Sequence, residues 1–104
     1  MAQYRRACAV ADVADGTALR VVLGDIPVAV VRSGGEVYAI HDMCSHANVA
    51  LSEGEIDDQT IECWLHGSRF DLVTGRPTGL PATKPVPVYP VKIDGDDVLV
   101  AVAP

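Results

Sequence analysis

The chain has 104 residues, of which 49% are hydrophobic, and its formal net charge is −6. A chain of this length forms one hydrophobic core and rarely divides, so we expect a single domain over residues 1–104. The negative charge argues against nucleic acid or an anionic membrane as a partner, and it favours either a basic protein partner or simply solubility.

Runs of alternating apolar residues between turn residues predict a series of short strands. Val-rich segments favour strands because β-branched side chains pack well on a pleated surface. The predicted strands are Ala18–Leu23, Ile26–Arg32, Glu36–Ile40, Thr60–Trp64, Arg69–Val73, Tyr89–Ile93 and Asp97–Val102. The turn Ser33-Gly34-Gly35 predicts a hairpin of the second and third strands. One helical turn is expected near Val10–Asp15.

Five prolines follow the fifth predicted strand, between Pro77 and Pro90. Proline cannot donate a hydrogen bond to a β-ladder, so we expect a stiff surface connection or an edge strand here. The strands at both ends of the chain predict an antiparallel β-barrel or sandwich base, over about residues 1–41 and 76–104. The middle of the chain, about residues 42–75, is then an inserted subdomain.

Two short motifs in this middle segment carry the chemistry. They are Cys44-Ser45-His46 and Cys63-Trp64-Leu65-His66, and each offers one thiol and one imidazole. A [2Fe-2S] cluster with two thiolates on one iron and two imidazoles on the other requires this set of donors. A zinc site of two cysteines and two histidines is the chemical alternative, although its usual signature groups Cys with Cys and His with His.

Charge explains what histidine ligands would do for such a cluster. Two thiolates and two sulfides balance two ferric ions, so the oxidised centre is roughly neutral and accepts an electron more readily than a four-thiolate centre. Histidine ligation therefore raises the reduction potential to roughly −150 to +300 mV, compared with about −400 mV for plant-type ferredoxins.

The segments 63–71, 37–40 and 86–91, together with Thr74-Gly75, resemble the Rieske family. The resemblance covers most of the chain. It implies an all-β fold with a cluster-binding subdomain and one [2Fe-2S] cluster per chain, and the ligands that it implies are Cys44, His46, Cys63 and His66. It also implies that Gly79-Leu80-Pro81 is the proline loop that shields the cluster, with Pro81 beside it.

Three positions decide the subclass. Val49 and Leu65 stand where respiratory Rieske proteins carry a pair of disulfide cysteines, and Phe70 stands where they carry a tyrosine. The chain instead resembles the soluble ferredoxins of ring-hydroxylating dioxygenases. These are electron carriers without a catalytic site, which pass single electrons from a flavin reductase to a terminal non-heme iron oxygenase. Ser68 resembles a serine that hydrogen-bonds a bridging sulfide and raises the potential.

Other functions remain open from the sequence. The chain is also compatible with a small Rieske subunit of a nitrite-reductase-like enzyme, with a ferredoxin that serves iron–sulfur assembly proteins, or with a zinc-stabilised interaction module. Three cysteines do not form a disulfide framework, and the first twenty residues lack the apolar segment of a signal peptide or membrane anchor. A reducing, cytoplasmic location is therefore expected.

Several other residues have less specific roles. Trp64 is expected to cap the cluster or to join a docking surface. Cys8 is expected to be a small buried apolar residue, and His41 is not expected to be a ligand. A group of acidic residues between the motifs is expected to help dock a basic partner: Glu53, Glu55, Asp57, Asp58 and Glu62.

Overall fold

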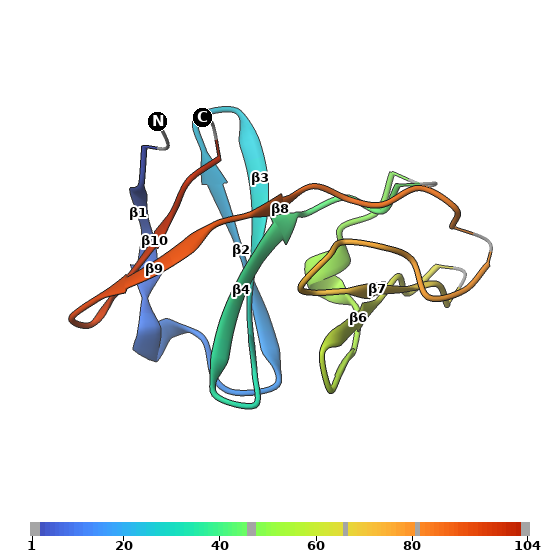
Figure 1. Ribbon diagram of the computed structural model, residues 1–104, viewed down its shortest axis with the longest axis horizontal. Helices are drawn as coiled ribbons and strands as arrows, with labels where there is room; N and C mark the ends of the chain where they lie inside the picture. Colours follow the sequence, from blue (N-terminus) through green and yellow to red (C-terminus); the bar gives the residue numbers. More distant parts are fainter. Residues whose placement is uncertain (1–2, 46–47, 66, 81, 103–104) are drawn as a thin grey trace.

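The computed structural model describes residues 3–45, 48–65, 67–80 and 82–102. Within these residues the strands form three antiparallel sheets, shown in Figure 1. The strands are β1 (Arg5–Ala9), β2 (Thr17–Leu23), β3 (Ile26–Ser33), β4 (Glu36–His41), β5 (Ile56–Asp57), β6 (Thr60–Glu62), β7 (Arg69–Asp71), β8 (Val88–Tyr89), β9 (Val91–Asp94) and β10 (Asp97–Val100). Two short 3-10 helices, η1 (Val10–Asp12) and η2 (Leu51–Glu53), complete the described elements.

The two sheets made by the ends of the chain are β2-β3-β4-β8 and β1-β10-β9, and we call them the base sheets. In the first of them β3 pairs with β2 and β4 along nearly its whole length. The glycines of the connecting turns permit these tight hairpins, since Gly24 and Gly34 have φ angles of 65° and 60°, which suit glycine best. The all-β fold expected from the sequence is therefore confirmed.

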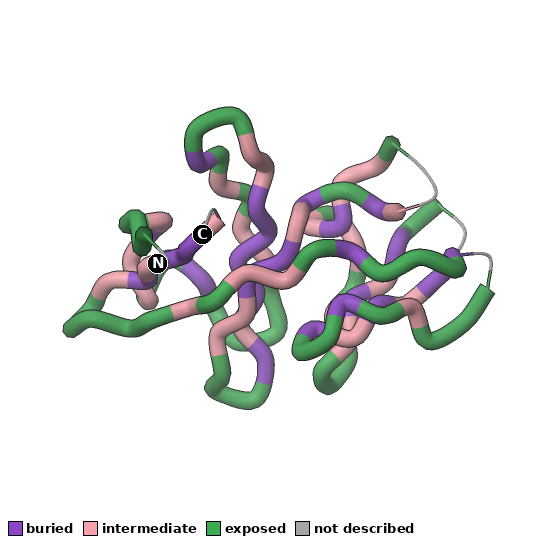
Figure 2. The backbone as a smooth tube through the Cα atoms, turned by 45° about the horizontal axis from the view of Figure 1, so that its top comes forward, coloured by how far each residue is buried: buried purple, intermediate pink, exposed green. Residues whose placement is uncertain are grey.

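Strand β3 is buried on both faces. Its four central residues, Val28 to Val31, are all 0% exposed. Side chains alternate across a strand, so Val28 and Val30 enter one hydrophobic core with β10, whereas Ala29 and Val31 enter a second core. Figure 2 shows this buried stretch running through the middle of the molecule.

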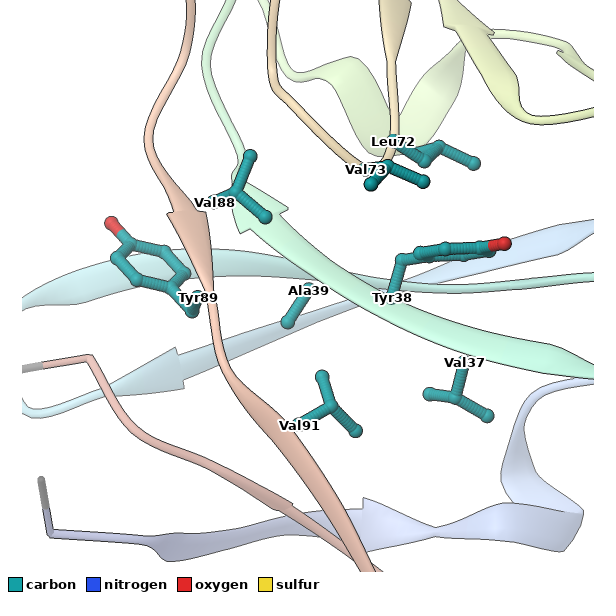
Figure 3. Close-up of a pocket in the computed structure, with 8 residues that line it drawn as sticks. All are labelled: Val37, Tyr38, Ala39, Leu72, Val73, Val88, Tyr89 and Val91. Atoms are coloured by element: carbon teal, nitrogen blue, oxygen red, sulfur yellow. The ribbon is translucent and has the colours of Figure 1, made fainter.

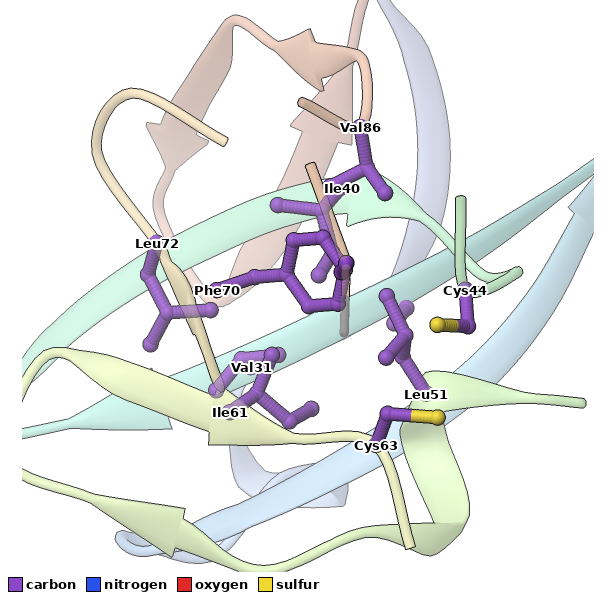
Figure 4. Close-up of a cluster of buried hydrophobic side chains, with 11 residues drawn as sticks. Val31, Ile40, Cys44, Leu51, Ile61, Cys63, Phe70, Leu72 and Val86 are labelled. Atoms are coloured by element: carbon purple, nitrogen blue, oxygen red, sulfur yellow. The ribbon is translucent and has the colours of Figure 1, made fainter. Parts of the chain in front are cut away.

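The third sheet, β5-β6-β7, comes from the middle of the chain and packs over the second core. Figure 4 shows Phe70 and Ile61 of this sheet facing Val31 and Ile40 of the base sheets. Leu51 of η2 completes the packing and is 0% exposed. Burial of each such side chain stabilises the fold by about 1.5–3 kcal/mol.

The predicted strand Tyr89–Ile93 was wrong as one strand, because the chain passes at Pro90, which cannot donate a ladder hydrogen bond, from β8 in one base sheet to β9 in the other. Three other predicted strands are shorter than the sequence suggested. β6 ends at Glu62 and β10 ends at Val100. β7 ends at Asp71, because the Asp71 carboxylate accepts hydrogen bonds from the amides of Val73 and Thr74, at 2.7 and 3.1 Å, and forms a turn. The predicted helical turn is confirmed only over Val10–Asp12.

The proline-rich segment behaves as expected. Its last part forms β8, which is an edge strand of the base sheet and pairs with β4 at only two positions. Where β4 and β8 separate, an apolar groove of about 210 Å³ opens between the base sheets and the 72–73 turn (Figure 3). Tyr38 lies in this groove, and its hydroxyl accepts a hydrogen bond from the Gln59 amide at 3.3 Å.

In the described parts of the chain, no helix has the length and apolar character needed to cross a membrane.

Gly54 permits a close approach that brings the two cysteine-bearing segments together. A Cβ atom at this position would lie 1.7 Å from the carbonyl oxygen of Glu62. The φ angle of Gly54 is −87°, which any residue can adopt, so the lack of a side chain is what matters here. It lets the end of η2 lie against β6, directly before Cys63.

We therefore predict that Gly54→Ala lowers the free energy of unfolding by at least about 1–3 kcal/mol, the usual cost of overpacking. Urea unfolding followed by circular dichroism measures the change. Gly79→Ala is the matched control, because a Cβ at Gly79 meets no described atom within 4 Å. Equal stability of the two variants would contradict the role assigned to Gly54.

Candidate metal centre

Two buried thiols lie where the base sheets meet the third sheet. Cys44 is three residues beyond β4 and is 4% exposed, while Cys63 follows β6 directly and is 0% exposed. Figure 4 shows both side chains at the same end of the second core, on either side of Leu51. Residues 19 positions apart in the sequence therefore present sulfur atoms to one region of the structure.

Both cysteine loops are closed by equivalent backbone hydrogen bonds. The Cys44 amide donates to the carbonyl of Val49 at 3.0 Å, and the Cys63 amide donates to the carbonyl of Ser68 at 2.6 Å. Each bond spans five residues and begins at the cysteine. In the second loop the Gly67 amide also donates to the Cys63 carbonyl at 2.9 Å, with a φ of 78° that favours glycine. Protein atoms alone thus fix both loops at their bases.

The proline-rich segment packs beside the second cysteine loop. The Ala82 amide donates to the Ser68 hydroxyl at 3.0 Å, and the Thr78 amide donates to the Arg69 carbonyl at 2.8 Å. Ser68 is 1% exposed, so its hydroxyl lies inside the structure. A serine oxygen that accepts one bond still has its own hydrogen to donate to another acceptor.

The other predicted site residues divide into two groups. His46, His66 and Pro81 lie outside the described residues. Trp64 is 50% exposed, which favours a place on a docking surface over a buried cap. Among the described residues no group of three His, Cys, Asp or Glu side chains is arranged to hold a metal ion.

Two residues expected to have no ligand role make other contacts. The His41 ring nitrogen Nδ1 lies 3.2 Å from the Tyr89 hydroxyl, and burial raises the pKa of that tyrosine. Cys8 is 4% exposed and lies in the first core among Val98 and Val100, where burial raises the pKa of its thiol. The prediction that Cys8 is a small buried apolar residue is confirmed.

The acidic residues between the motifs do not all face the cysteine loops. The carbonyl of Asp58 accepts a hydrogen bond from Ser33 at the far end of β3, so the β5–β6 turn lies against the base sheets. The Glu62 carboxylate is 3.3 Å from the Arg69 guanidinium, which offsets its charge. Asp58 thus lies at the end of β3 remote from the first cysteine loop, whereas Glu62 directly precedes Cys63.

The donor set fits an iron–sulfur centre. Two buried thiols from separate loops can supply the thiolates for one iron. The Ser45 hydroxyl beside Cys44 is buried and has no hydrogen-bond partner among the described residues. Leaving such a group unpaired costs about 1–3 kcal/mol, and a sulfur-rich anionic group nearby would supply an acceptor.

The sequence did not single out a further group beside the first loop. Asp42 is 1% exposed, and its carboxylate contacts Arg20 and Ser52. The three residues are 10 to 32 positions apart, and the isolated Asp42 matches no motif, so only the folded chain reveals the contact.

Comparison with known proteins gives a consistent result. The Rieske [2Fe-2S] domain family matches residues 3–90. The ferredoxin subunit of 3-phenylpropionate/cinnamic acid dioxygenase from Shigella boydii serotype 4 (strain Sb227) is 48% identical over 95 residues, which cover 90% of this chain and 89% of that protein.

Solved structures agree with the sequence match. The ferredoxin of carbazole 1,9a-dioxygenase from Nocardioides aromaticivorans IC177 superimposes with a TM-score of 0.91 at 40% identity, over 95% of this chain and 97% of that one. A second match comes from a complex of reduced oxygenase and oxidized ferredoxin in carbazole 1,9a-dioxygenase, with a TM-score of 0.88 and 40% identity. It covers 94% of this chain and 92% of that one.

The fold and the paired thiol loops thus define a small iron–sulfur electron carrier. The chain belongs to the Rieske [2Fe-2S] family, with one cluster per chain, and it is a ferredoxin of the dioxygenase type rather than an enzyme. These relatives confirm the ferredoxin interpretation over a zinc module or a nitrite-reductase subunit, and they give no support to a role in cluster assembly.

The Ser68 hydroxyl accepts a hydrogen bond from Ala82 and keeps its own hydrogen to donate, which supports its predicted effect on the reduction potential. We predict that Ser68→Ala lowers the reduction potential by up to about 60–130 mV, because a hydrogen bond to a charged acceptor contributes roughly 1.5–3 kcal/mol and about 59 mV corresponds to 1.4 kcal/mol for one electron. Protein-film voltammetry measures this shift. Ser33→Ala removes a buried serine at the far end of β3 and is expected to leave the potential unchanged. An unchanged or raised potential in Ser68→Ala would contradict the prediction.

Proposed function

We propose that this chain carries single electrons from a flavin reductase to the terminal oxygenase of a ring-hydroxylating dioxygenase, and that its cluster ligands are Cys44, His46, Cys63 and His66. The observation that carries this proposal is the pair of buried thiols in two equivalently closed loops. The solved complex of an oxygenase with a 40% identical ferredoxin supports the partner.

The cluster supplies reversible uptake of one electron. The protein's own residues hold it, limit access of water to it and present it to a partner. The Cys44 and Cys63 thiolates would bind one iron from buried positions, while the second core behind them excludes water from that side. The backbone bonds at the base of each loop fix the thiols in place, so little rearrangement accompanies the change of charge.

Part of the exposed surface of the cysteine loops and the facing proline segment is apolar. We call it the apolar tip, and its members are large exposed hydrophobic residues next to the loops or on the facing proline segment: Met43, Trp64, Leu65 and Leu80, which are 38%, 50%, 44% and 80% exposed. In Figure 1 the green, yellow and orange loops that carry them reach the end of the molecule away from the β9–β10 turn. Exposed hydrophobic residues gathered in this way mark interaction sites.

This arrangement assigns docking chiefly to the apolar tip. Electron-transfer encounters bury little area, so a few apolar contacts close to the cluster are sufficient for a short-lived complex. The Asp58 carbonyl holds the β5–β6 turn against the base sheets, and we assign the exposed acidic side chains of this turn only long-range steering of a basic partner.

Two further points belong to the proposal. The third sheet and its loops form the cluster-binding subdomain, about residues 42–75, within one domain that spans 1–104. The protein works in the cytoplasm, where reducing conditions protect its thiolates and cluster.

The three cysteines provide a direct test of the ligand assignment. We expect protein made under anaerobic conditions to contain two irons and two acid-labile sulfides per chain, and Cys44→Ala and Cys63→Ala to lose both. Cys8→Ala is the matched control, because Cys8 is equally buried but lies in the other core, and it should retain the cluster. Iron and sulfide analysis with electron paramagnetic resonance after dithionite reduction measures the outcome. A cluster retained in Cys63→Ala would overturn the assignment.

Docking can be tested with a second matched pair. Leu80→Ala should slow the reoxidation of the reduced protein by the oxygenase component of 3-phenylpropionate dioxygenase by about fivefold or more, because a central apolar contact is worth at least ~1 kcal/mol. Ile93→Ala removes an exposed aliphatic side chain from β9 and should leave the rate unchanged. Stopped-flow absorbance at low and high salt gives the rates. Equal rates for both variants, together with a steep fall in rate at high salt, would favour acidic docking instead.

A further inference from the structure

Asp42 carries a buried charge at the start of the first cysteine loop. Its side chain is 0% exposed, and one carboxylate oxygen accepts from the Arg20 guanidinium at 3.0 Å. The same oxygen accepts from the Ser52 hydroxyl at 2.6 Å, and the other oxygen accepts from the Ser52 amide at 2.7 Å. A buried carboxylate is tolerated only when it is paired and hydrogen-bonded in this way.

These bonds connect the two ends of one loop. Asp42 lies directly before residues 43–51, and Ser52 lies directly after them. The loop carries Cys44. The backbone amide of Cys44 donates a hydrogen bond to the Val49 carbonyl, which closes the loop a second time, inside the contact between Asp42 and Ser52. The Asp42 amide also donates to the Pro27 carbonyl at 3.0 Å, which fixes the start of the loop to β3. The loop is thus held at its ends by protein atoms.

The charges of this group are unequally exposed to water. The Arg20 side chain is 47% exposed, so water and salt screen its positive charge, whereas the Asp42 carboxylate is enclosed. Asp42 is two residues from Cys44, which puts their Cα atoms at most about 7.6 Å apart. A poorly screened negative charge that lies so close to Cys44 along the chain opposes the arrival of an electron on a group bound by Cys44.

We propose that Asp42 is a positioning residue for the first ligand loop, and that the Asp42–Arg20 pair sets the reduction potential by holding a fixed negative charge beside that loop. The proposal rests on the function proposed above. It assigns opposite effects to the two partners: Asp42 lowers the potential and Arg20 raises it.

Two charge variants and one uncharged variant test this in the full, cluster-loaded chain. Asp42→Asn keeps the shape of the side chain and is expected to raise the potential, whereas Arg20→Gln is expected to lower it. Ser52→Ala changes no charge, so it should shift the potential less than either variant but speed the loss of iron to a chelator several-fold. Film voltammetry gives the potentials, and electron paramagnetic resonance g-values check that the ligand set is intact.

Asp97→Asn is the matched control for charge. Asp97 on β10 forms an ion pair with Arg6 on β1, at 2.9 Å. Both strands belong to the β1-β10-β9 sheet, and both side chains are about half exposed. The reduction potential of the Asp97→Asn variant should stay at the wild-type value. If Asp42→Asn does not fold, the fall in potential of Arg20→Gln decides the proposal.

Shifts of the same sign in Asp42→Asn and Arg20→Gln, no shift in Arg20→Gln, or an equal shift in Asp97→Asn would overturn the proposal. Failure of the proposed function is a separate result, because it would appear as reduced wild-type protein that a dioxygenase oxygenase component does not reoxidise.

Discussion

Burial of β3 on both faces is the constraint on which the rest of the structure depends. The run Val28 to Val31 has no exposed surface, and its alternating side chains belong to two different hydrophobic cores. One core closes the base sheets, and the other supports the third sheet. Because β3 and β4 are shared by both, the first cysteine loop, which leaves β4, has a rigid origin.

The cysteine loops combine this rigidity with an exposed rim. Cys44 and Cys63 are buried, their loops are closed by bonds of equal span, and Met43, Trp64 and Leu65 beside them are exposed. A ferredoxin needs both properties. A fixed, dry environment keeps reorganisation small when the charge changes, while an apolar surface close to the cluster allows brief contact with a partner.

Electrostatics around the site follow the tertiary structure rather than the net charge. Among the acidic residues between the cysteines, Asp58 is held by its carbonyl at the far end of β3, and Glu62 is paired with Arg69. The enclosed charge beside the first loop is Asp42 instead, whose partners Arg20 and Ser52 come from β2 and η2. A formal charge of −6 therefore says little about the field at the site.

The sequence by itself determined the cofactor chemistry, the all-β class and most strand positions. Thiol and imidazole donors at short, repeated spacings have few other uses, and the alternation of Val and Ile residues is a local signal that survives in the fold. The predicted ends of β6, β7 and β10 extend too far; at β7 the reason is that the Asp71 turn depends on local hydrogen bonds that apolar alternation does not record.

Only the tertiary structure decided which partners the polar residues of the cysteine loops and the third sheet contact. The contacts of Ser68 with Ala82, of Asp42 with Arg20, and of Asp58 with Ser33 join residues 14 to 25 positions apart. Such pairs leave no periodic pattern in the chain, since they arise when separate strands and loops pack on the two cores that share β3.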